Sequence, residues 1–216
     1  MGKWFTSAPP HVETSTKSPE NLKMRTLSVV FLLCAGASLS SAQVGEISLS
    51  FGDSLFKDNV LGFADAVTQY KMVDGFRVTA RLTLNTKRFI GHEFGYAYSR
   101  SKLGIVGAPD QVGTSVHQGF YDFLVYATPE GSRIRPFVAG GGQFNTFVPP
   151  GASVTYGTGT TKYGGNFGGG VKVRLTSMFA LRLDARDYVT TKPFDLAGKS
   201  GALHLIEASA GLGLYF

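Results

Sequence analysis

The stretch LIEASAGLGLYF, residues 205–216, alternates between two kinds of residue along its whole length. Successive side chains of a β-strand point to opposite faces, so a strand of this sequence has one apolar face and one small or polar face. Chain ends are poorly ordered unless something holds them, and a terminal segment patterned this closely predicts a strand paired within a sheet. The apolar face would carry Ile206, Ala208, Ala210, Leu212, Leu214 and Phe216.

The same period of two recurs through the chain from Val44 onward, and no long window repeats at helical spacing. It is clearest in VDGFRVTARLTLN (73–85), NFGGGVKVRLT (166–176) and MFALRLDARDYV (178–189). In each stretch one alternate set is apolar and the other contains arginine, lysine, aspartate or threonine. Eight strands are predicted, over residues 44–56, 73–84, 87–99, 114–127, 133–147, 162–175, 178–190 and 203–216.

The connections between these strands alternate between short and long. Short turns follow the second, fourth and sixth strands, at residues 85–86, 128–132 and 176–177. If neighbouring strands pair in an up-and-down sheet, all the long connections lie at one end and all the tight turns at the other. The long connections are predicted over residues 57–72, 100–113, 148–161 and 191–202.

The composition agrees with a β-protein and excludes several other classes. Glycine contributes 28 of 216 residues and aromatic residues 12%, a combination typical of strands and turns. The single cysteine, Cys34, leaves no internal disulfide. The net charge of +6 comes from scattered residues rather than from a basic face, so no nucleic-acid partner is expected.

The N-terminal region is predicted to direct export. From Met24 the sequence MRTLSVVFLLCAGASLSSAQ has a basic residue, an apolar run from Leu27 to Leu33 and small residues that favour cleavage after Ala42. The apolar run is far shorter than the ~20 residues that a membrane-spanning helix needs. Residues 1–42 are therefore interpreted as a polar leader plus signal peptide, with translation starting at Met24, and residues 43–216 as the folded domain.

Two barrels of opposite polarity fit eight alternating strands. A lipocalin-like carrier turns its apolar face inward around a ligand, whereas an outer-membrane barrel turns it toward lipid and keeps polar side chains inside. The polar face here combines charged residues with glycines, which suit a narrow interior that must hold long side chains. The apolar face carries aromatic residues near strand ends, as at the two membrane interfaces. The rings are Phe51, Phe76, Tyr96, Tyr98, Tyr121, Phe144, Phe167, Phe179 and Phe216.

These features predict an all-β protein: an eight-stranded antiparallel up-and-down transmembrane β-barrel after an N-terminal signal peptide. The runs RPFVAGGGQF (135–144), FGGGVKVRLT (167–176) and FALRLDARDYVT (179–190) resemble the small outer-membrane β-barrel family of the OmpA/OmpX type, over residues 43–216. The resemblance implies a location in the outer membrane, contact with its lipid and insertion by the barrel-assembly machinery. It also implies that this machinery recognises the last strand through Ile206, Leu212, Leu214, Tyr215 and Phe216.

The inward charges are expected to pair with one another and fill the bore, because eight strands leave room only for side chains. A narrow conducting pore is the alternative. The network is predicted to contain Arg77, Arg81, Glu93, Asp122, Lys172, Arg174, Arg182, Asp184, Arg186 and Glu207, with Glu46 and Arg135 as further inward candidates.

No catalytic, cofactor or metal site is predicted. A lipid-modifying barrel enzyme would need a serine, a histidine and an acid together, and the candidates Ser115, His117, His204 and Glu207 lie on strands that are not neighbours. His92, by its parity, falls on the outward face. The expected protein is a monomer with a structural or surface-interaction role, exerted through its external loops. A pore, a lipid-modifying enzyme and a soluble lipocalin-like carrier are the alternatives.

Overall fold

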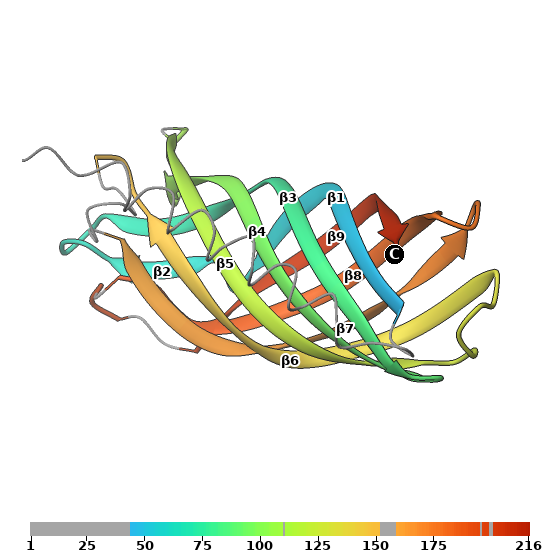
Figure 1. Ribbon diagram of the computed structural model, residues 1–216. Helices are drawn as coiled ribbons and strands as arrows, with labels where there is room; N and C mark the ends of the chain where they lie inside the picture. Colours follow the sequence, from blue (N-terminus) through green and yellow to red (C-terminus); the bar gives the residue numbers. More distant parts are fainter. Residues whose placement is uncertain (1–43, 110, 152–158, 195, 199–200) are drawn as a thin grey trace, which may run out of the picture. The chain divides into compact units, whose positions relative to one another are not determined.

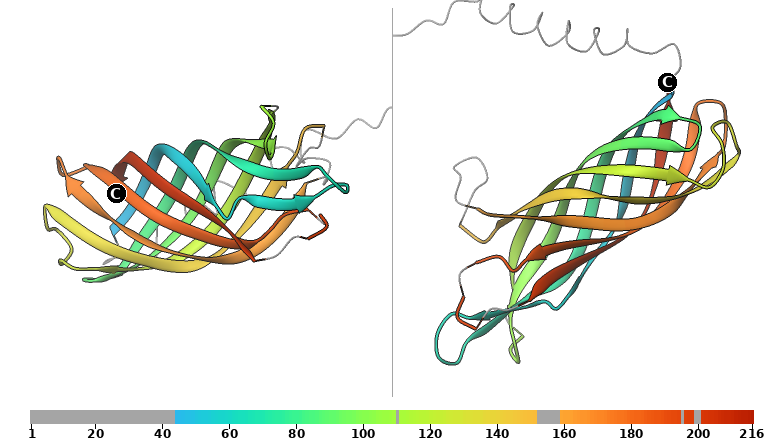
Figure 2. Two further views of the ribbon diagram at one scale, coloured as in Figure 1. Left: turned by 180° about the vertical axis from the view of Figure 1, so that it is seen from behind. Right: turned by 90° about the horizontal axis from the view of Figure 1, so that it is seen from below.

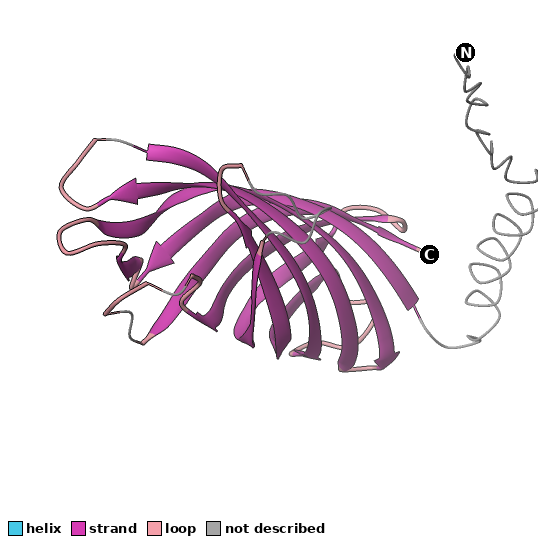
Figure 3. Cartoon of the chain, turned by 90° about the vertical axis from the view of Figure 1, so that its left-hand side faces the viewer, coloured by secondary structure: helices cyan, strands magenta, loops and turns pink. Residues whose placement is uncertain are grey.

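The computed structural model describes residues 44–109, 111–151, 159–194, 196–198 and 201–216, all within the compact unit Ala42–Phe216. The predicted leader, signal peptide and cleavage site lie outside the described residues. In the described part, no helix is long and apolar enough to cross a bilayer. Figure 3 shows that the described chain consists almost entirely of strands and their connections.

The described residues form nine antiparallel strands, and eight of them close into a barrel (Figure 1). The eight predicted strands are confirmed within a few residues at most ends, and the short β2 is additional. The strands are β1 (Val44–Lys57), β2 (Val60–Phe63), β3 (Gln69–Lys87), β4 (Ile90–Ile105), β5 (Gln111–Tyr126), β6 (Ile134–Val148), β7 (Thr160–Arg174), β8 (Phe179–Thr191) and β9 (Ala202–Tyr215).

The barrel closes because β1 pairs with both β3 and β9, while β3 to β9 pair in sequence order. Figure 2 shows the blue β1 beside the red β9. The last strand therefore has a partner on each side, β8 and β1, along nearly its whole length. Two further bonds, from Gly45 N–H to Phe216 O (3.1 Å) and from Phe216 N–H to Gly45 O (3.0 Å), hold the terminal residue.

The long connections are shorter than the sequence predicts, and here the predicted boundaries are wrong. The expected 57–72 connection contains β2 and the start of β3, which form a hairpin around residues 64–68. The expected 100–113 connection is mostly strand, because β4 continues to Ile105 and β5 begins at Gln111. Polar residues on both faces hide these extensions from a period-two reading, while the backbone pairing between β4 and β5 continues out to Gly104 and Gln111. The end of the barrel that carries these connections is termed the loop end.

The two faces of the barrel have the predicted polarity. Large apolar residues lie on the outside, where the side chains of Phe94, Tyr96 and Leu212 are 50–56% exposed. The side chains of Arg77 and Arg182, on the alternate positions, point into the lumen and are fully buried. The barrel thus has an apolar exterior and a polar interior, the reverse of a lipocalin-like carrier.

Candidate functional site

The lumen holds a network of ion pairs, and Glu207 of β9 is one of its centres. The guanidinium groups of Arg77 and Arg81 on β3 donate to its carboxylate at 3.0 and 2.6 Å. Hydroxyl groups of Tyr188 (3.0 Å) and Ser209 (2.5 Å) donate to the same carboxylate. Hydrogen bonds to a charged group are about twice as strong as neutral ones. Glu207 of β9 therefore links its own strand to β3 and β8 inside the lumen.

Glu93 of β4 is the second centre. Arg182 and Arg186 of β8 each donate to it at 2.7 Å, and the Thr83 hydroxyl donates at 2.7 Å. Arg81 lies 3.5 Å from Glu93 through Nε, so it links this centre to Glu207. All these side chains are buried, which means that removing one member would leave its partners charged and unpaired.

The network continues to the opposite side of the lumen and is balanced in charge. Lys172 of β7 donates to Glu46 of β1 at 2.5 Å, and Arg186 also pairs with Asp122 of β5. Five cations and five carboxylates take part, so this ion-paired group carries no net charge. The cations are Arg77, Arg81, Lys172, Arg182 and Arg186, and the carboxylates are Glu46, Glu93, Asp122, Asp184 and Glu207.

Arg174, which the sequence groups with these cations, is not joined to them. Its guanidinium lies over the ring of Tyr215, 4.8 Å from the ring centroid. Arg135 similarly lies over Tyr126, at 3.7 Å. Both pairs lie toward the tight-turn end of the barrel, where Arg135 is in register with Lys172. Arg135 also pairs with the Glu130 carboxylate at 3.4 Å, so cation–π contacts and one further ion pair fill the lumen at this end.

Inward glycines make room for this filling. A β-carbon at Gly95 would lie 2.0 Å from Cζ of Phe120, and one at Gly170 would lie 2.8 Å from Cζ of Phe137. Both rings cross the lumen beside cations, since Phe120 lies 5.8 Å from the Arg81 guanidinium and Phe137 lies 5.1 Å from that of Arg182. Glycine in a strand lowers the stability of the fold by about 0.5–1 kcal/mol relative to alanine. At these two positions it leaves the space that the aromatic ring occupies.

The loop end of the lumen is filled by apolar side chains, which the sequence analysis missed. Leu205, two residues before Glu207 on the same inward row, is 1% exposed. Its register partners Phe56 on β1 and Tyr188 on β8 belong to the same cluster. The available signal was the run LHLI (203–206), which is apolar on both faces rather than on one. The buried members are Phe56, Leu61, Met72, Val116, Phe120, Phe147, Tyr188, Leu203 and Leu205.

The histidines among the described residues lie on the outward face, and each has a polar partner there. His92 lies 2.7 Å from the Tyr121 hydroxyl, and His117 lies 2.6 Å from that of Tyr96, in both cases through Nδ1. His92 and His117 are thus each paired with a tyrosine on a neighbouring strand, which lowers the free-energy cost of a polar ring on an apolar surface. The parity assigned to His92 therefore agrees with the structure.

The residues considered for lipid modification are not gathered in one place. The Ser115 hydroxyl bonds to Tyr98 at 3.0 Å, and Glu207 is buried within the lumen network. His204 of β9 instead lies 2.8 Å from Asp187 of β8, a pair on the outward face that the sequence did not suggest. Within the described residues, no group of three or more histidine, cysteine, aspartate or glutamate side chains could hold a metal ion.

The predicted assembly signal divides between the two faces of β9. Leu212, Leu214 and Phe216 are exposed on the outside and Ile206 is half-buried on the same row, whereas Tyr215 is buried in the lumen. The ring of Phe216 covers Gly45, where a β-carbon would lie 2.5 Å from the ring. The terminal aromatic residue thus rests on the outer surface beside the first strand of the barrel.

No family model and no curated protein matches this sequence. Solved structures do match. Neisserial surface protein A is 14% identical, with a TM-score of 0.52 over 80% of this chain and 97% of that one. The outer membrane protein AlkL, solved in lipid bilayers, is 14% identical, with a TM-score of 0.51 over 81% of this chain and 89% of that one. The chain therefore has the fold of the small outer-membrane β-barrels, as predicted.

Proposed function

We propose that this chain is a monomeric outer-membrane β-barrel that acts at its surface, in envelope integrity or in contact with other surfaces, and not through its lumen. The fold shared with AlkL and Neisserial surface protein A supports the location. The exposed apolar exterior supports it too, since a large apolar surface needs lipid to cover it. Export through the signal peptide and insertion by the barrel-assembly machinery belong to the same proposal.

The filled lumen is the observation that carries this proposal. Arg77, Arg182, Glu93 and Glu207 are fully buried, so solvent does not reach the side chains at the middle of the barrel. Above them Leu205 and Phe147 are also buried at the loop end. A pore needs a continuous aqueous path, and neither layer offers one. A conducting function is therefore disfavoured, and no catalytic role is assigned.

The loop end is the part available to external partners. The hairpin between β2 and β3 carries Val67, which is 84% exposed, within a turn shaped by Asp65. The Asp65 carboxylate accepts the N–H groups of Val67 (2.9 Å) and Thr68 (2.7 Å). This ordered and exposed tip is where a surface contact would form, because binding residues concentrate on loops held by a rigid scaffold.

The test combines fractionation with conductance. The wild-type protein should appear in the outer-membrane fraction, migrate as a compact band until boiled, and give no steady current in planar bilayers. Large steady openings would overturn the closed-lumen proposal and favour the pore. A soluble protein with one band at all temperatures would overturn the membrane location.

A second measurement separates the two surface roles. Cells lacking the protein are complemented with the wild type or with a variant whose residues 64–68 are replaced by a two-residue turn. If only adhesion to surfaces is lost in the variant, the hairpin tip mediates contact. If resistance of the cells to detergent requires the barrel but not the tip, the role is in envelope integrity. A change in lipid A mass on expression, abolished by His117→Ala or His204→Ala, would instead favour the enzyme.

A further inference from the structure

The outward row of β4 changes from aromatic to cationic residues toward the loop end. Phe94, Tyr96 and Tyr98 are followed at the next alternate positions by Arg100 and Lys102, which are both exposed. Lys71 of β3 pairs in register with Gly104 of β4, so it adds a third cation beside them. In the described part of the chain, none of these three cations forms an ion pair.

Two carboxylates, Asp74 and Asp53, lie near this group, and among the described residues neither forms an ion pair with its cations. Asp74 of β3 accepts the backbone N–H of Phe56 at 2.7 Å. Asp53 of β1 is in register with Phe76, which separates it from Arg100 on β4. Lys71, Arg100 and Lys102 therefore form a cationic group next to an apolar surface. Such a group attracts anionic lipid headgroups at the membrane interface.

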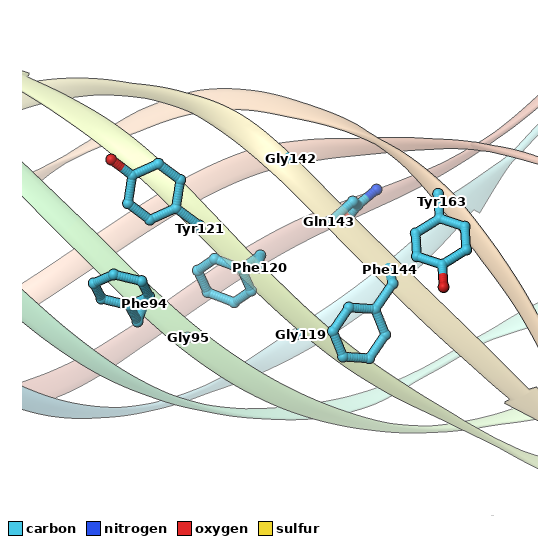
Figure 4. A pocket seen from close by; sticks show the side chains of 9 residues that line it. All are labelled: Phe94, Gly95, Gly119, Phe120, Tyr121, Gly142, Gln143, Phe144 and Tyr163. Atoms are coloured by element: carbon cyan, nitrogen blue, oxygen red, sulfur yellow. The ribbon is translucent and has the colours of Figure 1, made fainter.

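Below the cations, an apolar groove crosses the outward face of β4, β5 and β6. It has a volume of about 560 Å³, a floor that includes Gly119 and Gly142, and walls made by aromatic rings. Figure 4 shows the rings of Phe94, Tyr121, Phe144 and Tyr163 spread over the ribbons around Gly119 of β5 and Gly142 of β6. A β-carbon at Gly142 would meet nothing within 4 Å, so the groove exists because side chains are missing there.

A second groove lies on the other side of Phe94. It has a volume of about 390 Å³ and is lined by Ile47, Ala80, Leu82, Phe94 and Tyr96. Phe94 thus forms a ridge between two apolar grooves, both on strands next to the three cations. Two grooves that share Phe94 can take more than one acyl chain of a lipid.

The spacing between the grooves and the cations matches one lipid leaflet. Phe94 and Arg100 are six residues apart on β4, which is about 20 Å along a strand that rises ~3.4 Å per residue. With a tilt of about 45°, this becomes a depth of about 14 Å, close to half of the ~30 Å hydrocarbon core. A phosphate at Arg100 would therefore place its acyl chains beside Phe94.

We propose that the outward face of β3–β6 is a binding site for lipid A, with phosphate bound by Lys71, Arg100 and Lys102 and acyl chains in the grooves on both sides of Phe94. The inference rests on the proposed outer-membrane location. Lipid A combines phosphate groups with several acyl chains, and the site offers several cations above two grooves. A single-chain or zwitterionic lipid would leave part of it unused.

The test measures lipid retained by the folded full-length protein. The barrel is extracted in mild detergent, and bound lipid is counted by native mass spectrometry. Arg100→Gln combined with Lys102→Gln should reduce retained lipid A about tenfold. Gly142→Leu adds a side chain whose β-carbon would meet no protein atom within 4 Å, so it fills the larger groove and should reduce retention severalfold while all cations remain. The matched control removes two exposed cations at the opposite end, through Arg88→Gln and Arg133→Gln, and should retain wild-type amounts.

The outcomes separate this site from the proposed function. The same variants are also refolded into phosphatidylcholine vesicles that contain a small fraction of either lipid A or diacyl phosphatidylglycerol. Lipid retention by these refolded proteins does not depend on where the protein is located in the cell. Preference for lipid A, lost in both site variants, supports the site. Equal retention by wild type, site variants and control, or equal binding of phosphatidylglycerol, overturns it. A barrel found in the outer membrane that retains no lipid A overturns the site and leaves the location intact.

Discussion

Leu205 and Glu207 are neighbours on the same inward row of β9, yet they lie in opposite surroundings. Glu207 accepts bonds from Arg77 and Arg81, whereas Leu205 packs with Phe56 and Tyr188. The ion-paired side chains around Glu93 and Glu207 form a charged layer in the middle of the lumen. This charged layer specifies which strands face one another, because each ion pair joins two particular residues across the lumen. The cluster around Leu205 forms an apolar layer at the loop end, and it keeps water away from the ion pairs. Ion pairs interact more strongly where water is excluded. Position on the inward face therefore does not by itself determine polarity.

The charged layer should be the more sensitive of the two to truncation. Glu93→Ala leaves Arg182 and Arg186 buried without a carboxylate partner, and it should lower the free energy of unfolding by about 3–5 kcal/mol. Because the single tryptophan, Trp4, precedes the barrel, unfolding in urea is followed by far-UV circular dichroism and by gel mobility. Glu130→Ala, which removes a carboxylate 26% exposed near Arg135, is the control. If Glu93→Ala lowers the free energy of unfolding by less than about 1 kcal/mol, the ion pairs do not determine which strands face one another.

The apolar layer should respond less. Leu205→Ala should cost about 2–3 kcal/mol, in the lower part of the range for buried leucines, since side chains near the end of the barrel can relax into the space. Leu212→Ala on the outward row of the same strand is the control, and it should cost little in lipid because its side chain is 56% exposed. Equal losses for the two variants would mean that the cluster around Leu205 is loosely packed.

The boundary between the layers is tested at Gly95. Phe120 belongs to the apolar cluster and covers Gly95, where an added β-carbon would meet its ring. Gly95→Ala should therefore destabilise the barrel by about 1–2 kcal/mol through overpacking. Gly142→Ala, on the outward face with nothing within 4 Å, should not destabilise it. If the two substitutions change the free energy of unfolding equally, the ring of Phe120 does not mark the boundary between the charged and the apolar layer.

The smallest effect is expected outside both layers, at Asp65. Hydrogen bonds from the backbone N–H groups of Val67 and Thr68 hold the pKa of Asp65 below its ordinary value of 3.8. A carboxyl whose folded-state pKa is lowered stabilises the turn above its unfolded pKa, and this contribution is lost as the pH falls through the folded pKa. Amide NMR shifts of Val67 and Thr68 should therefore titrate with a midpoint below 3.8. Asp65→Asn should abolish this titration, and a midpoint above 3.8 would contradict the turn.

The sequence determined the strands and the polarity of their faces, because a period of two is a local property of the chain. Phe94, Leu212 and Arg77 all lie on the face that their parity predicts. The closed eight-stranded barrel also followed from strand number, alternating connection lengths and the patterned last strand.

Only the tertiary structure decided which inward side chains meet, where the apolar layer begins and where the outer grooves lie. Arg77 and Glu207 are 130 residues apart, so no local pattern could pair them. Leu205 is apolar on a polar row, and Gly142 forms a groove only because rings from neighbouring strands stand around it. The physical reason is that backbone alternation depends on adjacent residues, whereas ion pairing and packing depend on register between strands and on closure of the barrel.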